Sequence, residues 1–179
     1  MVEGHFAYVV VATIVITEND VDIKQVLSEV VGPRSRGFHW TKEGPQSRSR
    51  MVDCLQDLGA CAHIVIHHPT GRRGQERARN AALRHLLPLV VHDGVDEILI
   101  ESRDTRQDAR DRALILGRLL ELGCDDIAYD WGDKSMPELW LPDAVCGAVA
   151  MYLNQSDPGW YERLQESGVI TEPRYISGA

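Results

Sequence analysis

Apolar and polar positions along the chain group into blocks that predict strands separated by helices. The stretch from Phe6 to Thr17 is apolar and carries no charge, which indicates a strand buried on both faces, near the middle of a sheet. Elsewhere, short apolar runs indicate strands, and apolar residues at helical spacing indicate helices. The further expected strands cover 60–67, 95–101 and 125–131, and the expected helices cover 21–31, 45–58, 75–92, 108–122 and 137–152.

Proline and glycine mark the ends of several of these helices. Gly32 and Pro33 end the first helix, Pro45 begins the second, and Gly59 and Gly123 follow the second and the fourth. Strands that alternate with helices favour parallel pairing through right-handed crossovers. The sequence therefore predicts an α/β fold of three layers, in which a mixed, mostly parallel sheet has helices on both faces.

The regular pattern extends to about residue 153 and then weakens. We therefore expect one α/β domain over 1–153 and a C-terminal extension over 154–179 that packs on this domain or trails from it. Within the extension, a short helix is expected around Trp160 to Gln165, followed by a loop. The residues that interrupt the pattern there are Pro158, Gly159, Gly168 and Pro173.

The composition is that of an ordinary globular protein, with 44% hydrophobic and 26% charged residues. The net charge is -8, so any contact with nucleic acid requires a local basic patch. The apolar run from Phe6 to Ile16 is eleven residues long, whereas a membrane-spanning helix needs about 20 residues. The run also lacks the basic segment and the cleavage site of a signal peptide. No membrane association is expected, and the cytoplasm is the predicted compartment.

The cysteines show no pattern that is typical of a zinc site or a redox pair. No two of them form a C-x-x-C motif, and none has a spacing to histidine that the known zinc motifs use. We interpret them as reduced, mostly buried thiols of a cytosolic protein. The four cysteines are Cys54, Cys61, Cys124 and Cys146.

Two carboxylates occupy positions where an acid is costly to bury. Glu101 ends the apolar run of the strand at 95–101, and Asp143 follows Pro142 at the start of an apolar helix. A buried acid requires a positive partner, and a divalent cation on oxygen ligands is a good candidate. Both acids also have a structural alternative. Asp143 can simply complement the helix dipole, and Glu101 can pair with a neighbouring arginine such as Arg103 or Arg106.

The segment F-H-W-T-K-E places His39 between Phe38 and Trp40, outside any clear periodic element. Such a loop either packs on the sheet or lines a pocket. The histidine is then a metal ligand, a proton shuttle or a hydrogen-bonded packing residue.

A basic segment, T-G-R-R-G-Q, follows a predicted strand and precedes a predicted helix. Backbone amides at a helix start can bind an anion, and the arginines Arg72, Arg73 and Arg77 add positive charge that suits phosphates. The segment matches neither the P-loop nor the G-x-G-x-x-G motif. It is interpreted either as a nucleic-acid contact or as a solvated arginine face of a helix.

The order of these features resembles the DUF3800 proteins of the RNase H-like superfamily over about residues 6–153. The family has a closing pattern of the type L-Q-x-A-D-x-x-x-G-A. Here the chain reads L-W-L-P-D-A-V-C-G-A-V, with Asp143 on the family's acid, while Glu101 falls on an acid at the end of a central strand. The chain departs from the family in two places. The D-E-S-G strand that opens the family has no counterpart upstream, where only Glu3 is available, and Gly37 stands where the family tends to have an acid.

The resemblance implies a phosphodiesterase, a nuclease that depends on Mg²⁺ or Mn²⁺ and acts on nucleic acid. Glu101 and Asp143 would be its primary metal ligands, with Asp104 as an auxiliary ligand, and His39 would act near the leaving group or the attacking water. The phosphate-binding residues would be Arg72, Arg73 and Arg77. The alternatives are a catalytically inactive module that binds nucleic acid or a protein partner, including a second copy of the chain, and a nucleotide-binding regulator that uses T-G-R-R-G.

Overall fold

Five strands and six helices make up the part of the chain that the computed structural model describes, residues 7–15, 22–32, 37–68 and 74–177. Two short 3-10 turns, η1 (Trp40–Lys42) and η3 (Pro137–Leu139), precede α2 and α5. The strands are β1 (Tyr8–Ile14), β2 (Cys61–His68), β3 (Glu97–Glu101), β4 (Ala128–Gly132) and β5 (Arg174–Ser177). The helices are α1 (Ile23–Val31), α2 (Pro45–Asp57), α3 (Gln75–His92), α4 (Thr105–Leu122), α5 (Trp140–Leu153) and α6 (Gly159–Glu166).

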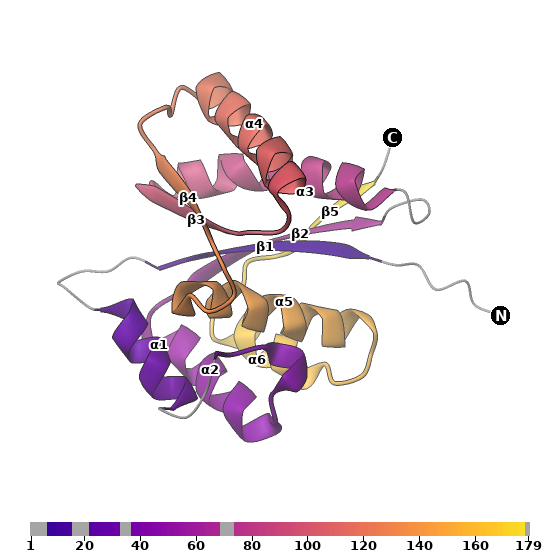
Figure 1. Cartoon of the computed structure of the whole chain (residues 1–179). Helices are drawn as coiled ribbons and strands as arrows, with labels where there is room; N and C mark the ends of the chain where they lie inside the picture. The colour runs from indigo at the N-terminus through magenta and orange to yellow at the C-terminus, as the bar shows by residue number, and fades with distance from the viewer. Residues whose placement is uncertain (1–6, 16–21, 33–36, 69–73, 178–179) are drawn as a thin grey trace.

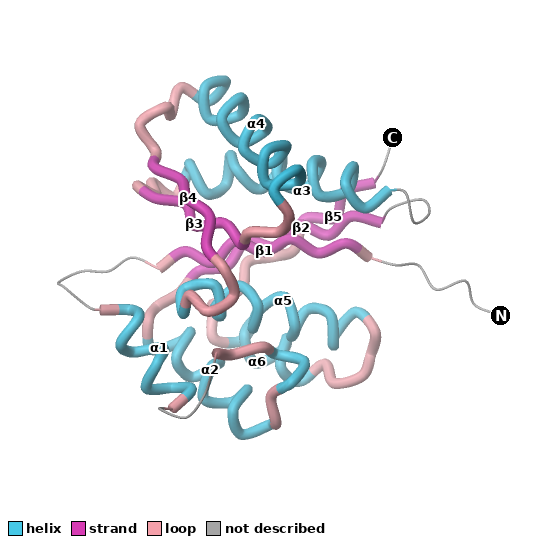
Figure 2. The backbone as a smooth tube through the Cα atoms, viewed as in Figure 1, coloured by secondary structure: helices cyan, strands magenta, loops and turns pink. Residues whose placement is uncertain are grey.

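The strands lie between two groups of helices. In Figure 1, α3 and α4 lie on one side of the strands, and α1, α2, α5 and α6 lie on the other. Figure 2 shows the same arrangement by secondary structure, with the strands in the middle. The predicted α/β class is therefore confirmed, and helices cover both sides of the strands. Within the described residues, no helix combines the length and the apolar character that crossing a bilayer requires.

The described strands form two separate hydrogen-bonded sheets. One has the order β1-β2-β5 and the other consists of β3 and β4. The β2–β5 and β3–β4 pairs are parallel, whereas β1 and β2 are antiparallel, with Tyr8 opposite His67 and Ile14 opposite Cys61. Two helices, α1 and α2, separate β1 from β2. An even number of helices returns the chain to the end of the sheet at which β1 finished, so β2 runs in the opposite direction.

The prediction that the first strand lies near the middle of a sheet is wrong for the described residues. Among them β1 has β2 as its hydrogen-bonded neighbour and lies at one end of the three-stranded order. Much of β1 is only half-buried, while Val10 and Ile14 are buried. A long apolar run is thus also compatible with an end strand whose two faces are both covered by helices. Phe6, Ile16 and Thr17 lie outside the described residues.

The alternation of side chains along β2 divides the core between its two faces. Ala62, Ile64 and Ile66 lie in the larger cluster, together with side chains from α1, α2, α5 and α6. Val65 points to the other face, where it packs with Val10 and with residues of α3. A third cluster joins α3 and α4 to β3 and β4.

The described part of the C-terminal segment, residues 154–177, contributes to the same core. Its helix α6 lies close to the expected one, and Tyr161, Leu164, Val169 and Ile170 are buried in the larger cluster. The loop that was expected after this helix contains β5, which pairs with β2. Four residues, R-Y-I-S, are too short a run for periodicity to indicate a strand.

Candidate functional site

Asp143 lies in the first turn of α5 and binds the F-H-W segment, which is about 100 residues earlier in the chain. The backbone N–H of Trp40 donates to its Oδ2 at 2.8 Å, and Nδ1 of His39 lies 3.2 Å from each of its two oxygens. The side chains of Asp143 and His39 remain 31% and 40% exposed. The predicted pair of His39 and Asp143 is therefore brought together, at a position that solvent can reach.

Trp40 fixes this segment to the core. Its ring is buried and makes edge-to-face contacts with Phe38 and Trp160, at centroid distances of 6.4 and 5.6 Å. The guanidinium of Arg48 lies 5.0 Å from the ring centroid and donates to the backbone oxygen of Trp40. Because these contacts fix Trp40, they also restrict the backbone of its neighbour His39.

Glu101 is the last residue of β3, as expected, and its side chain is 47% exposed. Its Oε1 lies 3.2 Å from Nζ of Lys134, in the segment that follows β4. The sequence analysis had considered Arg103 or Arg106 as the partner. Arg103 instead pairs with Glu76 and Asp111, so the lysine after the neighbouring parallel strand takes that role.

The negative charges of both predicted acids, Glu101 and Asp143, affect the thiol of Cys146. Cys146 lies three residues after Asp143 on α5. Burial raises the pKa of Cys146 to about 11, and the negative charges of Asp143 and Glu101 raise it as well. Both carboxylates are therefore near enough to this thiol for their charges to affect it. Among the described residues, however, Glu101, Asp143 and His39 do not form a group whose ligand atoms all lie within 4.8 Å of one another.

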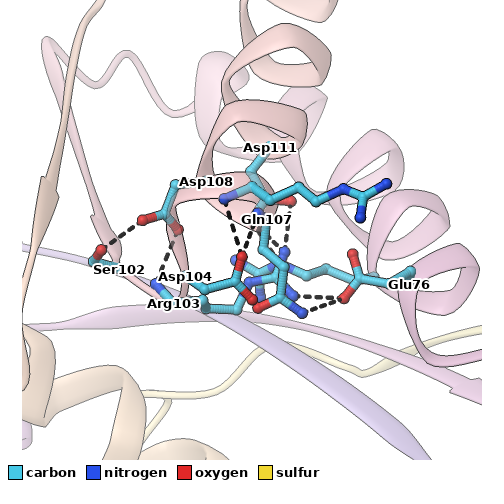
Figure 3. A network of polar contacts seen from close by, with 9 residues as sticks. Glu76, Ser102, Arg103, Asp104, Gln107, Asp108 and Asp111 are labelled. Carbon is cyan, nitrogen blue, oxygen red and sulfur yellow. Dashed lines mark hydrogen bonds and ion pairs between the residues drawn. The ribbon is translucent and has the colours of Figure 1, made fainter.

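Asp104 has a structural role in the described fold. It is the N-cap of α4, and its Oδ1 accepts from the backbone N–H groups of Arg106 and Gln107 at 3.0 and 2.9 Å (Figure 3). Ser102 and the backbone of Arg103 in turn donate to Asp108, which lowers the pKa of that carboxyl. The turn after β3 is thus ordered by side-chain caps.

A buried ion-pair network lies beside this turn (Figure 3). Asp111 is fully buried on α4 and accepts from Arg79 at 2.8 Å and from Arg103 at 3.0 Å. Burial alone would lower the pKa of Arg103, but Glu76 and Asp111 raise it. The sequence analysis missed Asp111. A detectable signal was its position four and eight residues before Ile115 and Leu119, on the buried stripe of α4.

The predicted phosphate-binding arginines are described only in part. Arg72 and Arg73 lie outside the described residues. Arg77 is exposed on α3, while Arg79 of the same helix is used by Asp111. One arginine of this helix, Arg79, therefore belongs to an internal ion pair.

No protein-family model, no curated protein and no solved structure matches this chain.

Proposed function

We propose that this chain is a divalent-metal-dependent phosphodiesterase that acts on nucleic acid, with an RNase H-like arrangement of strands and helices. The observation that carries the proposal is that Glu101, at a strand end, and Asp143, at a helix start, both lie near the thiol of Cys146. Carboxylates at the carboxyl ends of strands, beside the start of a helix, are a common position for active-site groups in α/β folds.

The donor set fits one hard cation. Two carboxylates offer the oxygen ligands that Mg²⁺ and Mn²⁺ prefer, and water can complete the shell because both side chains are partly exposed. Asp104 caps α4, so a second ion would lack ligands among these residues. The bound ion would supply an activated water and would neutralise charge on the phosphoryl oxygens.

Lys134 lies beside Glu101, where such a cation would bind. An exposed ion pair of this kind contributes about 0–1 kcal/mol, because water screens it and two long side chains lose freedom. A divalent ion shared by two carboxylates can therefore displace the ammonium group at little cost. Lys134 would then be free to contact a phosphate.

His39 would move a proton in the proposed reaction. An ionised Asp143 can only accept, so Nδ1 of His39 donates to it, and Nε2 carries a lone pair. The side chain is 40% exposed, and Nε2 is the nitrogen that takes a proton from water or passes one to a leaving group. Asp143 would fix the tautomer of His39 and would also be a ligand of the ion.

The test combines metal binding with cleavage. Calorimetry with Mn²⁺ and digestion of end-labelled single- and double-stranded DNA and RNA are measured for the wild type, Glu101→Gln and Asp143→Asn. The matched control is Glu97→Gln, an exposed acid at the other end of β3. We expect both site variants to keep the far-ultraviolet circular dichroism of the wild type and to lose metal binding and cleavage. Cleavage that survives Asp143→Asn removes Asp143 from the mechanism, and a wild type that binds no Mn²⁺ refutes the proposal.

A non-catalytic binding module is the second candidate. It is favoured by the fact that both acids have partners without a metal, Lys134 for Glu101 and the backbone of Trp40 for Asp143. This module would show no Mn²⁺ heat at all, and Glu101→Gln would leave its binding of nucleic acid or protein unchanged.

A further inference from the structure

Three potential metal ligands gather where β2 begins and α3 ends. Cys61 is the first residue of β2, His63 follows two residues later, and Asp93 comes directly after α3. One ligand atom from each lies within 4.8 Å of the other two. Among all the described residues, this is the group of three or more His, Cys, Asp or Glu side chains that meets that criterion.

Strand geometry and helix length bring these residues together. Residues two apart on a strand share a face, so Cys61 and His63 both point toward the side of β2 that α3 covers. Asp93 lies at the C-terminal end of α3, where the helix dipole disfavours a negative charge. Its carboxylate therefore needs a positive partner, and its Oδ2 lies 2.7 Å from Nε2 of His63.

The second nitrogen of His63 also has a polar neighbour. Nδ1 lies 3.3 Å from Oγ1 of Thr171, and this oxygen also lies 3.3 Å from the backbone oxygen of Ala62. When the Thr171 hydroxyl donates to Ala62, Oγ1 accepts from Nδ1 of His63, and Nε2 offers a lone pair on the side of Asp93. In this tautomer, a metal ion bound by Nε2 and by the Asp93 carboxylate gives both groups a partner.

The chemistry of the three ligands indicates the kind of ion. Thiolate, imidazole and carboxylate together suit Zn²⁺, whereas Mg²⁺ and Ca²⁺ take oxygen ligands. A hydrogen bond from the unligated nitrogen of a histidine, such as the one to Thr171, is the usual way in which a metal-binding ring is oriented.

We propose that Cys61, His63 and Asp93 bind one Zn²⁺ ion. The site shares no residue with the Glu101–Asp143 region and does not depend on the function proposed for it. The sequence pattern predicts only a reduced thiol at Cys61, because the cysteines form no C-x-x-C pair and show no spacing to histidine that is typical of zinc. The third ligand, Asp93, is supplied by the end of a helix thirty residues later.

A cavity of about 450 Å³ lies beside His63 and Asp93. Its lining includes His63 and Asp93 as well as His92, Thr171 and Glu172. A water molecule or an exogenous ligand fits a site with three protein ligands and an open position. The ion also connects three segments that are distant in the chain, the start of β2, the end of α3 and the strand-like segment around Thr171.

Cobalt is the probe for the test, because Co²⁺ replaces Zn²⁺ and reports a thiolate ligand by its charge-transfer band. The chelator-treated full chain is titrated with Co²⁺ and then with Zn²⁺, and thermal unfolding is followed with and without Zn²⁺. We expect a charge-transfer band that saturates at one equivalent of Co²⁺ bound by the thiolate, that Zn²⁺ abolishes, and that is accompanied by a rise in melting temperature with Zn²⁺. Release of a proton on binding, measured in unbuffered solution, accompanies the conversion of the Cys61 thiol to a thiolate.

The variants separate a built site from general metal affinity. Cys61→Ser and Asp93→Asn remove ligands, Thr171→Val removes the orienting hydrogen bond, and Cys124→Ser is the control, a partly buried cysteine outside the group. We expect Cys61→Ser to lose the band, Thr171→Val to bind roughly 10–100-fold more weakly, and Cys124→Ser to behave as the wild type. A wild type that binds no Co²⁺, or a charge-transfer band that persists in Cys61→Ser, overturns the proposal.

Discussion

Replacing Gly147 by alanine tests how tightly α5 is packed against the segment that carries His39. Gly147 lies four residues after Asp143, in the interior of α5. A Cβ built on it collides with Cγ and Cδ1 of the Trp40 ring and lies 2.7 Å from the Cβ of Trp40. The tryptophan cannot easily move, because its ring is 2% exposed and its backbone N–H is bound to Asp143.

Two opposing effects decide the outcome. Alanine in place of glycine in a helix interior stabilises by about 1 kcal/mol. Overpacking of a rigid core costs typically about 1–3 kcal/mol, and the collision with a backbone-proximal atom such as the Cβ of Trp40 favours the upper end. We therefore expect Gly147→Ala to lower the free energy of unfolding by about 2 kcal/mol, the difference of these two terms.

The assay is urea unfolding followed by tryptophan fluorescence, with Gly117→Ala as the matched control. Gly117 lies inside α4, and a Cβ there meets no atom within 4 Å, so this variant should be as stable as the wild type or up to about 1 kcal/mol more stable. The reasoning is refuted if Gly147→Ala is as stable as Gly117→Ala. The same displacement of Trp40 should also loosen the contact between His39 and Asp143, which is visible as a changed histidine titration in NMR spectra.

Two further predictions concern buried groups. Asp111→Ala leaves the guanidinium groups of Arg79 and Arg103 without their shared carboxylate. We expect the free energy of unfolding, measured in urea, to fall by about 3–5 kcal/mol. A fall below about 1 kcal/mol would contradict the network. Cys54 and Cys146 have pKa values of about 11, above the ordinary value of 9.0. The folded protein therefore holds these thiol protons more tightly than the unfolded chain, and stability that is present below pH 9.0 is lost as the pH rises toward about 11. Unfolding measured across this window should show the decline, and replacing both cysteines by alanine should reduce it.

Glu101 and Asp143 show what a local pattern can predict. Each stands at the end of an apolar element of the sequence, and both positions agree with the described fold. Their partners were not identifiable in the same way. Lys134 follows a different strand, and the Trp40 backbone lies in a segment about 100 residues from Asp143. Whether these acids hold a metal ion remains a prediction.

The sequence by itself determined where the described helices and the strands β1 to β4 form, because apolar periodicity and capping residues act within a few turns of chain. The range 75–92 predicted for a helix is that of α3, and Gly123, which adopts a positive φ, ends α4. Only the tertiary structure decided the antiparallel direction of β1 and the presence of β5. It also decided that Cys61 and His63 meet Asp93 and Thr171. Strand pairing and ligand clusters depend on contacts between residues that are distant in sequence, and no local pattern encodes which distant residue will be the neighbour.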